Sequence, residues 1–158
     1  RAPPGGGIIG FVGKESKRKG LDVAVAAVAA LRRRRPGLEL WVLGPEPAEV
    51  RHLFAGWDGG YRLHGWADGF ALYPQIDVLL HPARAEPYGM VVAEAMAARV
   101  PVVVSDRCGI APEIGAQAGA VLPLNATPAQ WAEACERQLD RDAPPPGYGR
   151  GWDRVAQE

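Results

Sequence analysis

Several features that mark specialised classes of protein are absent or scarce in this sequence. It has two cysteines, Cys108 and Cys135, in 158 residues, and neither lies in a CxxC pair. That is too few for a disulfide framework, so they predict reduced thiols in a cytoplasmic protein. No apolar stretch approaches the ~20 residues that a membrane-spanning helix needs. The first residues also do not have the pattern of a signal peptide.

Charge of one sign is not in excess, and metal-binding patterns are missing. Lys and Arg number 18, Asp and Glu number 18, and the formal net charge is zero. This balance argues against a surface built as a whole for nucleic acid or for anionic membrane. The histidines, His52, His64 and His81, have no spacing of three or four residues between them, so we predict no metal site. His81 ends a predicted strand and is expected to line a crevice.

Apolar runs alternate with helical patterns along most of the chain. Strands are predicted at residues 8–12, 38–43, 61–64, 76–81, 102–105 and 120–124, and the longest helices at 21–35, 89–98 and 127–140. Mostly apolar strands that alternate with helices indicate a parallel sheet covered on both faces. We therefore predict a Rossmann-like, three-layer α/β domain with about six strands, which binds ligands at the carboxyl ends of its strands.

The two ends of the chain differ in composition from the rest. Residues 1–7, rich in Pro and Gly, read as a linker cut from a larger protein, and residues 8–142 form the predicted domain. Residues 143–158 are predicted to be a Pro/Gly linker followed by a C-terminal helix.

A basic loop follows the first predicted strand. It runs from Gly13 to Gly20 and contains all three lysines of the chain, Lys14, Lys17 and Lys19. Glycines, cations and backbone N–H groups at a helix start together favour an anion site, here for a diphosphate. The alternative is a solvated basic loop. The four arginines at 32–35 are instead assigned to the negative end of a helix dipole, with contact to acidic lipids as the alternative.

Two carboxylates follow the fourth predicted strand. Glu86 lies in the loop and Glu94 inside the helix that follows, and both can face one crevice. Paired carboxylates can perform acid–base chemistry or hold sugar hydroxyls. The apolar neighbours of Glu94 indicate that it has a partner.

These motifs resemble a known family. EPYGMVVAEAMA, followed by RVPVVVSD and GIAPEI, is similar to the E-x7-E region of the retaining GT-B glycosyltransferases of family 4 (group 1). FVGKESKRKGLD at the front and GWDRVAQE at the end also resemble that family's pattern. The sequence departs from it at Arg107-Cys108-Gly109, where many members have paired glycines, and at Ala98-Arg99-Val100, where a Gly-x-Pro turn is common. We expect a less open loop at the first and a changed turn at the second.

The resemblance implies a function for the site. The chain would be the C-terminal domain that binds the nucleotide-sugar donor, UDP- or GDP-linked, and Glu86 would contact the donor sugar as the catalytic residue. Glu94 would hold the ribose, and the nucleobase would lie near Gly65 and Trp66, although packing is favoured for Trp66. The diphosphate and the sugar would be bound by Gly13, Lys14, Lys19, Tyr88, Gly89, Met90 and Val91.

The resemblance also implies partners and limits. The acceptor would be bound by an N-terminal domain of the same protein, without which the chain would catalyse little. No metal or other cofactor and no nucleic acid are expected. The protein would be cytoplasmic or peripheral at the inner face of the membrane, in glycan or glycolipid biosynthesis. Two alternatives stay open, a non-catalytic GT-B-like interaction domain and a related phosphorylase or epimerase.

Overall fold

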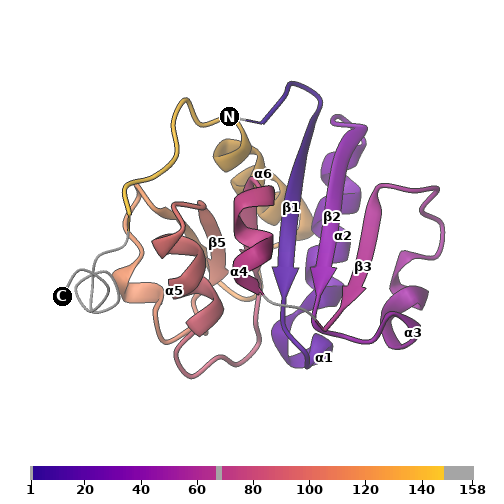
Figure 1. The fold of residues 1–158 in the computed structure, drawn as a ribbon, viewed down its shortest axis with the longest axis horizontal. Helices are drawn as coiled ribbons and strands as arrows, with labels where there is room; N and C mark the ends of the chain where they lie inside the picture. The colour runs from indigo at the N-terminus through magenta and orange to yellow at the C-terminus, as the bar shows by residue number, and fades with distance from the viewer. Residues whose placement is uncertain (1, 67–68, 148–158) are drawn as a thin grey trace.

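The fold is a single parallel sheet with helices on both faces (Figure 1). The computed structural model describes residues 2–66 and 69–147, and for 69–70 the backbone alone. The strands are Gly6–Val12 (β1), Gly37–Leu43 (β2), Tyr61–Gly65 (β3), Val78–His81 (β4), Val102–Ser105 (β5) and Gly119–Leu122 (β6). The helices are Ser16–Lys19 (α1), Leu21–Arg32 (α2), Pro47–Val50 (α3), Gly69–Leu72 (α4), Met90–Ala97 (α5) and Pro128–Leu139 (α6). Short 3-10 helices lie at Arg51–Phe54, Tyr73–Gln75 and Ala111–Glu113.

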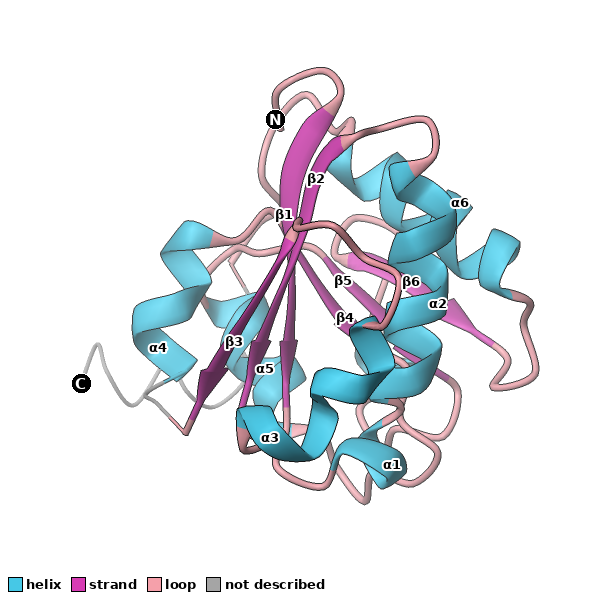
Figure 2. Ribbon diagram, turned by 90° about the vertical axis from the view of Figure 1, so that its right-hand side faces the viewer, coloured by secondary structure: helices cyan, strands magenta, loops and turns pink. Residues whose placement is uncertain are grey.

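The strand order decides where a ligand can bind. All six strands are parallel, in the order β3-β2-β1-β4-β5-β6. The order reverses between β1 and β4, so the loops that follow these two strands diverge and leave a crevice at the carboxyl edge. Helices α2 and α6 lie on one face of the sheet and α4 and α5 on the other (Figure 2). The predicted Rossmann-like fold is confirmed.

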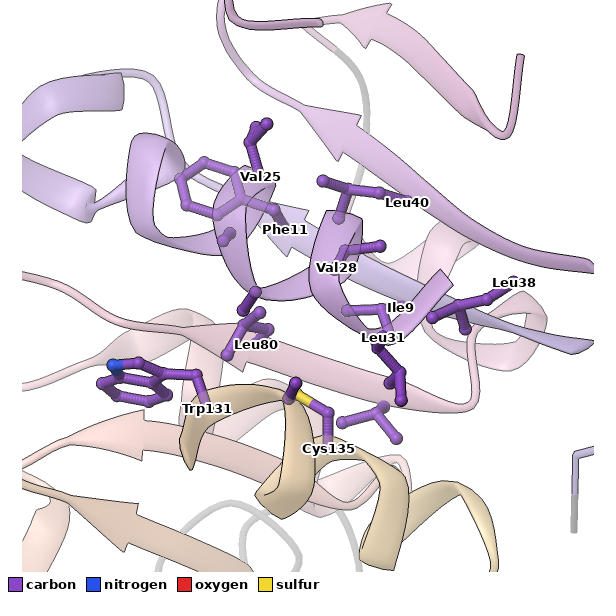
Figure 3. Packing of buried hydrophobic residues seen from close by; sticks show 14 of the residues in the cluster. Ile9, Phe11, Val25, Val28, Leu31, Leu38, Leu40, Leu80, Trp131 and Cys135 are labelled. Atoms are coloured by element: carbon purple, nitrogen blue, oxygen red, sulfur yellow. The ribbon is translucent and has the colours of Figure 1, made fainter. Parts of the chain in front are cut away.

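Two apolar clusters, one on each face of the sheet, form the core. Ile9 and Phe11 of β1 pack with Leu80 of β4, Val28 of α2 and Trp131 of α6, all 0–1% exposed (Figure 3). The second cluster lies beneath α5 and includes alternate residues of the same strands. Both faces of the strands are therefore buried, which explains their continuous apolar sequence.

The ends of two predicted segments differ in the structure. Helix α2 ends at Arg32, and the backbone N–H groups of Arg34 and Arg35 both donate to the Leu31 carbonyl in a closing turn. Gly6 and Gly7, which we assigned to a linker, belong to β1 and pair with β2. Ala2 is also buried, at 4% exposure, so the N-terminal segment is part of the domain. The predicted helix at 152–158 lies outside the described residues.

The altered turn after α5 keeps its geometry in spite of its sequence. Arg99 has φ 61°, and its N–H donates to the carbonyl of Met96, while the N–H of Val100 donates to that of Ala95. These two bonds define a Schellman motif, which favours glycine at the left-handed position. Arg99 occupies that position here, and β5 follows as expected, so the departure changes the turn residue alone.

Candidate functional site

The loops after β1 and β4 are joined by several polar contacts. Gly20 has φ 81°, and a side chain there would overlap the carbonyl oxygen of Pro82. Because glycine permits this approach, the backbone N–H of Arg84 can donate to the carbonyl of Arg18 over 2.8 Å. The Arg84 guanidinium also forms a bidentate pair with Asp22 of α2, at 2.8 and 2.7 Å. The two sides of the crevice therefore meet at its base.

Glu86 lies at this junction with two nitrogen partners. Lys19 Nζ donates to Oε1 of Glu86, and Nε2 of His81 lies 3.1 Å from the same oxygen. The Lys19 and Glu86 side chains are 14% and 11% exposed. The sequence predicted Lys19 in the loop after the first strand and Glu86 in the loop after the fourth, and the structure brings them into direct contact. His81 is 0% exposed, so our expectation that it lines the crevice is wrong.

These contacts keep Glu86 ionised. The hydrogen bond from His81 is the largest cause of a pKa lowered from 4.5 to about 2, and burial opposes it. The hydrogen bond and the charge of Lys19 also lower the pKa of Glu86. A carboxylate in this state accepts hydrogen bonds but does not donate a proton near neutral pH.

The loop after β5 fixes the backbone of Glu86. The Glu86 N–H donates to the carbonyl of Arg107, and the N–H of Gly109 donates to the carbonyl of Glu86 over 3.0 Å. A side chain at Gly109 would overlap the carbonyl of Pro87. Cys108 is buried, and burial is the largest cause that raises the pKa of its thiol to about 11. The Arg-Cys-Gly sequence thus forms a closed loop against Glu86.

Helix α5 begins beside Glu86 with free backbone donors. Gly89, with φ 108°, occupies the N-cap position, and no side chain caps the helix. The first bond from helix to N-cap runs from Ala93 to Gly89, so the N–H groups of Met90 and Val91 have no partner within the helix. Tyr88 and Met90 are 37% and 46% exposed. The positive end of the helix dipole is therefore accessible to an anion.

Glu94 has the partner that its apolar surroundings predicted. Tyr73 lies in the 3-10 helix Tyr73–Gln75, and its hydroxyl lies 3.0 Å from Oε2 of Glu94 and 3.3 Å from the Val91 carbonyl. Tyr73 is 1% exposed, while Glu94 is half-buried. A phenol below the helix thus supports a carboxylate that keeps acceptor capacity.

Glycines line the ends of β1, β2 and β3. The N–H of Gly13 donates to the carbonyl of Leu43, and the N–H of Gly44 donates to that of Gly65. Beside them Lys14 Nζ lies 4.5 Å from the centre of the Trp66 ring, a cation–π contact. Trp66 is 71% exposed, so the packing role that we favoured for it is wrong. An indole face at this edge is free to contact a planar ligand.

The arginine run contacts the protein itself. Arg35 is buried and donates to the carbonyl of Gly6 and to Asp140, and Arg34 pairs with Glu136. The Arg32 guanidinium lies 5.1 Å from the centre of the Trp57 ring. The structure therefore supports a structural role for this run over contact with acidic lipids.

Sequence reasoning missed two residues that support the site, Tyr73 and Arg84, and it placed His81 in the crevice rather than behind Glu86. Each acts through another residue. Tyr73 and Glu94 are 21 residues apart and Arg84 and Asp22 are 62 residues apart, whereas His81 and Glu86 are only five residues apart. The apolar neighbours of Glu94 signalled that a partner exists but not which one. Among residues 2–66 and 69–147, no three His, Cys, Asp or Glu side chains gather as metal ligands. The same residues contain no helix that is long and apolar enough to span a membrane.

Comparisons with known proteins identify the family to which the chain belongs. The family model for glycosyl transferases group 1 matches residues 6–141. The D-inositol 3-phosphate glycosyltransferase of Salinispora arenicola is 33% identical over 87% of the chain and 34% of its own length. The structure of WaaG, a glycosyltransferase involved in lipopolysaccharide biosynthesis, has a TM-score of 0.77 at 27% identity and matches 88% of this chain and 39% of WaaG.

A third comparison concerns the fold. Anabaena HepE, in a structure with UDP-glucose, has a TM-score of 0.72 at 19% identity over 84% of this chain and 39% of HepE. The chain spans about a third of the length of the first curated relative. The family model matches most of the chain, and the fold has the crevice described above. The chain belongs to the group 1 glycosyl transferases and corresponds to the C-terminal domain of their GT-B architecture.

Proposed function

We propose that this chain binds the nucleotide-sugar donor of a retaining glycosyltransferase, between the loops after β1 and β4. The observation that carries the proposal is the contact of Lys19 with Glu86 at the strand-order reversal. It places a cation for a diphosphate beside an ionised carboxylate for neutral hydroxyls. The uncapped start of α5 supplies further donors at the same edge.

The reaction would break the bond between the anomeric carbon of the sugar and the diphosphate. The electron pair of that bond passes to the diphosphate, the acceptor oxygen forms the new bond to the sugar, and the proton of the acceptor hydroxyl passes to the leaving diphosphate. Lys19, Lys14 and the N–H groups of Met90 and Val91 would stabilise the charge that develops on the leaving group. Glu86 would accept a hydrogen bond from a sugar hydroxyl and so orient the sugar. These cations and dipoles can act without a metal.

The remaining nucleotide would extend along the carboxyl edge towards β3. Glu94, held by Tyr73, would accept hydrogen bonds from the ribose hydroxyls. The base would lie beside Gly65 and the exposed ring of Trp66. The acceptor, and an N-terminal domain that binds it, would complete the site. The relatives named above support a sugar transfer but leave the acceptor of this protein open.

Substitution of Lys19 tests the proposal. In the native-length protein, transfer and hydrolysis are measured with UDP-, GDP- and ADP-linked sugars, and the anomer of the product is identified by NMR. We expect Lys19→Ala to reduce turnover at least about 100-fold, as removal of one donor at a developing anion does. Lys17→Ala, an exposed lysine in the same loop, is the matched control and should stay within about threefold.

Three outcomes would contradict the proposal. The first is that no nucleoside diphosphate binds at millimolar concentration and Lys19→Ala changes nothing. The second is binding without any turnover, which would favour the non-catalytic interaction domain. The third is a product of inverted configuration, which would overturn the retaining mechanism alone.

A further inference from the structure

The imidazole of His81 contacts the site through a single described side chain. His81 ends β4 and is 0% exposed. Its Nε2 lies 3.1 Å from Oε1 of Glu86. Its Nδ1 is buried and has no hydrogen-bond partner among the described residues. A ligand in the crevice cannot reach this ring, so any effect of the imidazole on a ligand must pass through Glu86.

The missing partner of Nδ1 identifies the tautomer. A proton on Nδ1 would bury a donor without an acceptor, which carries the full cost of removing that donor from water. A bare Nδ1 leaves only a lone pair unpaired, which proteins tolerate more often. The ionised Glu86 accepts hydrogen bonds and donates none, so Nε2 must carry the proton to bond with it. His81 therefore donates to Glu86 through its Nε2–H.

Both partners of the Glu86 carboxylate bind the same oxygen. Lys19 Nζ and His81 Nε2 each contact Oε1. Within residues 2–66 and 69–147, no hydrogen bond or ion pair involves Oε2 of Glu86. The backbone of Glu86 is fixed on both sides by the loop after β5. The carboxylate is thus held by one oxygen, and the other is left to accept.

We propose that His81 is a positioning residue, which together with Lys19 occupies Oε1 of Glu86 and so directs Oε2 to a hydroxyl of the donor sugar. The identity of the ligand in this inference rests on the proposed function, whereas the orientation of the carboxylate does not. His81 would then determine how much the sugar adds to the affinity for the nucleotide. Lys19 has a second role at the diphosphate, so His81 is the partner whose substitution isolates this effect.

The electrostatics of the pocket supports this assignment. Three titratable groups face Glu86: Lys19 from α1, His81 from β4, and the Cys108 thiol from the loop after β5. The hydrogen bond from His81 is the largest cause of the lowered pKa of Glu86, and burial acts against it. Loss of this donor is therefore expected to raise the pKa of Glu86 from about 2 towards 4.5.

Three variants of His81 and one control separate positioning from packing. His81→Gln places an amide N–H near the position of Nε2, His81→Asn places its amide too short to reach, and His81→Met removes the donor at similar volume. His52→Gln is the matched control, because His52 is an exposed residue of the 3-10 helix Arg51–Phe54. If the Met variant does not fold, the Asn variant serves in its place.

The first measurement is the ratio of the Kd of UDP to that of a UDP-sugar, in the native-length protein by calorimetry. If another nucleotide binds better, the corresponding GDP or ADP pair is used. In the Met and Asn variants we expect this ratio to fall about tenfold, which corresponds to the loss of one hydrogen bond to a charged group. The affinity of these variants for UDP itself should stay within about twofold of the wild type. The Gln variant and the control should keep the ratio. Equal loss in all three His81 variants would overturn the positioning role.

The second measurement needs no ligand. A 13C NMR titration of the Glu86 carboxylate should show its pKa rise in the Met and Asn variants and stay low in the Gln variant. No rise would overturn the inference even if a UDP-sugar binds. If the pKa rises but no nucleotide sugar binds to the wild type, the proposed function fails and the positioning of Glu86 by His81 stands.

Discussion

Charged clusters occupy both edges of the same sheet, and they differ in how completely their hydrogen-bonding groups are used. At the amino edge, the Arg35 guanidinium donates to the carbonyls of Pro3 and Gly6 and to Asp140. At the carboxyl edge, Glu86 uses one oxygen for both of its side-chain partners. A cluster with most of its groups paired holds the fold together, whereas a cluster with a free carboxylate oxygen keeps capacity for a ligand. This difference separates scaffold from site in a chain whose net charge is zero.

The largest effect on the free energy of unfolding is expected when the cluster around Arg35 is broken. Arg35→Met keeps the apolar stem but removes the side-chain donors to the Gly6 carbonyl and the partner of Asp140. Because the Arg35 side chain is 6% exposed, we expect a loss of about 3 kcal/mol in the free energy of unfolding, measured with urea. Arg33→Ala, an exposed neighbour, should change it by less than about 0.5 kcal/mol. Donor affinity of the folded Met variant should be unchanged, and a large loss of affinity would erase the distinction between the two edges.

A smaller effect on stability, which depends on pH, is expected from a substitution at the carboxyl edge of the sheet. Glu86 has a pKa lowered from 4.5 to about 2 by His81 and Lys19. Its contribution to stability is therefore present above about pH 4.5 and is lost as the pH falls towards 2. Compared with Glu86→Gln, the wild type should be more stable at pH 7, and the two should converge in acid when urea midpoints are followed with pH.

The control for that comparison removes a carboxylate from an exposed pair. Glu133 pairs with Arg137 one turn along α6, with 60% and 74% of the side chains exposed. Glu133→Gln should change the free energy of unfolding by less than about 0.5 kcal/mol at pH 7. If the stability difference between Glu86→Gln and the wild type changes no more with falling pH than it does for Glu133→Gln, the contacts at Glu86 do not hold its charge in the folded state.

The smallest expected effect is a gain in stability from a substitution at the amino edge of the sheet. Arg99 occupies the left-handed position of a Schellman motif at φ 61°, where glycine has no steric cost. We expect Arg99→Gly to raise the free energy of unfolding by up to about 1 kcal/mol, less the loss of its hydrogen bond to the Pro145 carbonyl. Thermal unfolding measures this, with Ala98→Gly as a control. Ala98 is right-handed at φ −82°, so glycine there should destabilise.

The sequence predicted the architecture well because each strand is recorded in local composition. Continuous apolar runs such as residues 102–105 are buried on both faces, and Thr127 begins α6 with the capping box that its sequence permits. Some boundaries of the elements were predicted less accurately. The first strand starts at Gly6 rather than at residue 8, and helix α2 ends at Arg32 rather than at residue 35. Glycines in a strand and arginines beyond a helix carry little local signal, and long-range pairing decided both.

The site was predicted in its parts but not in its connections. Lys19, Glu86 and Glu94 were identified from the resemblance and from their charge among glycines or apolar residues. Their partners could not be identified, because Lys19 and Glu86 are 67 residues apart and Tyr73 lies outside the predicted strands and the longest predicted helices. Trp66 shows the converse error, since a lone tryptophan is usually buried and this one is 71% exposed.

The sequence by itself determined the fold class, the family pattern and the residues that carry charge at the carboxyl edge. These properties depend on periodicity and composition, which are local. Only the tertiary structure decided that Lys19 and His81 share one oxygen of Glu86, that Tyr73 supports Glu94, and that Arg35 pairs with backbone carbonyls and Asp140. Such assignments depend on the order of the strands, because the reversal between β1 and β4 brings distant loops to within hydrogen-bonding distance.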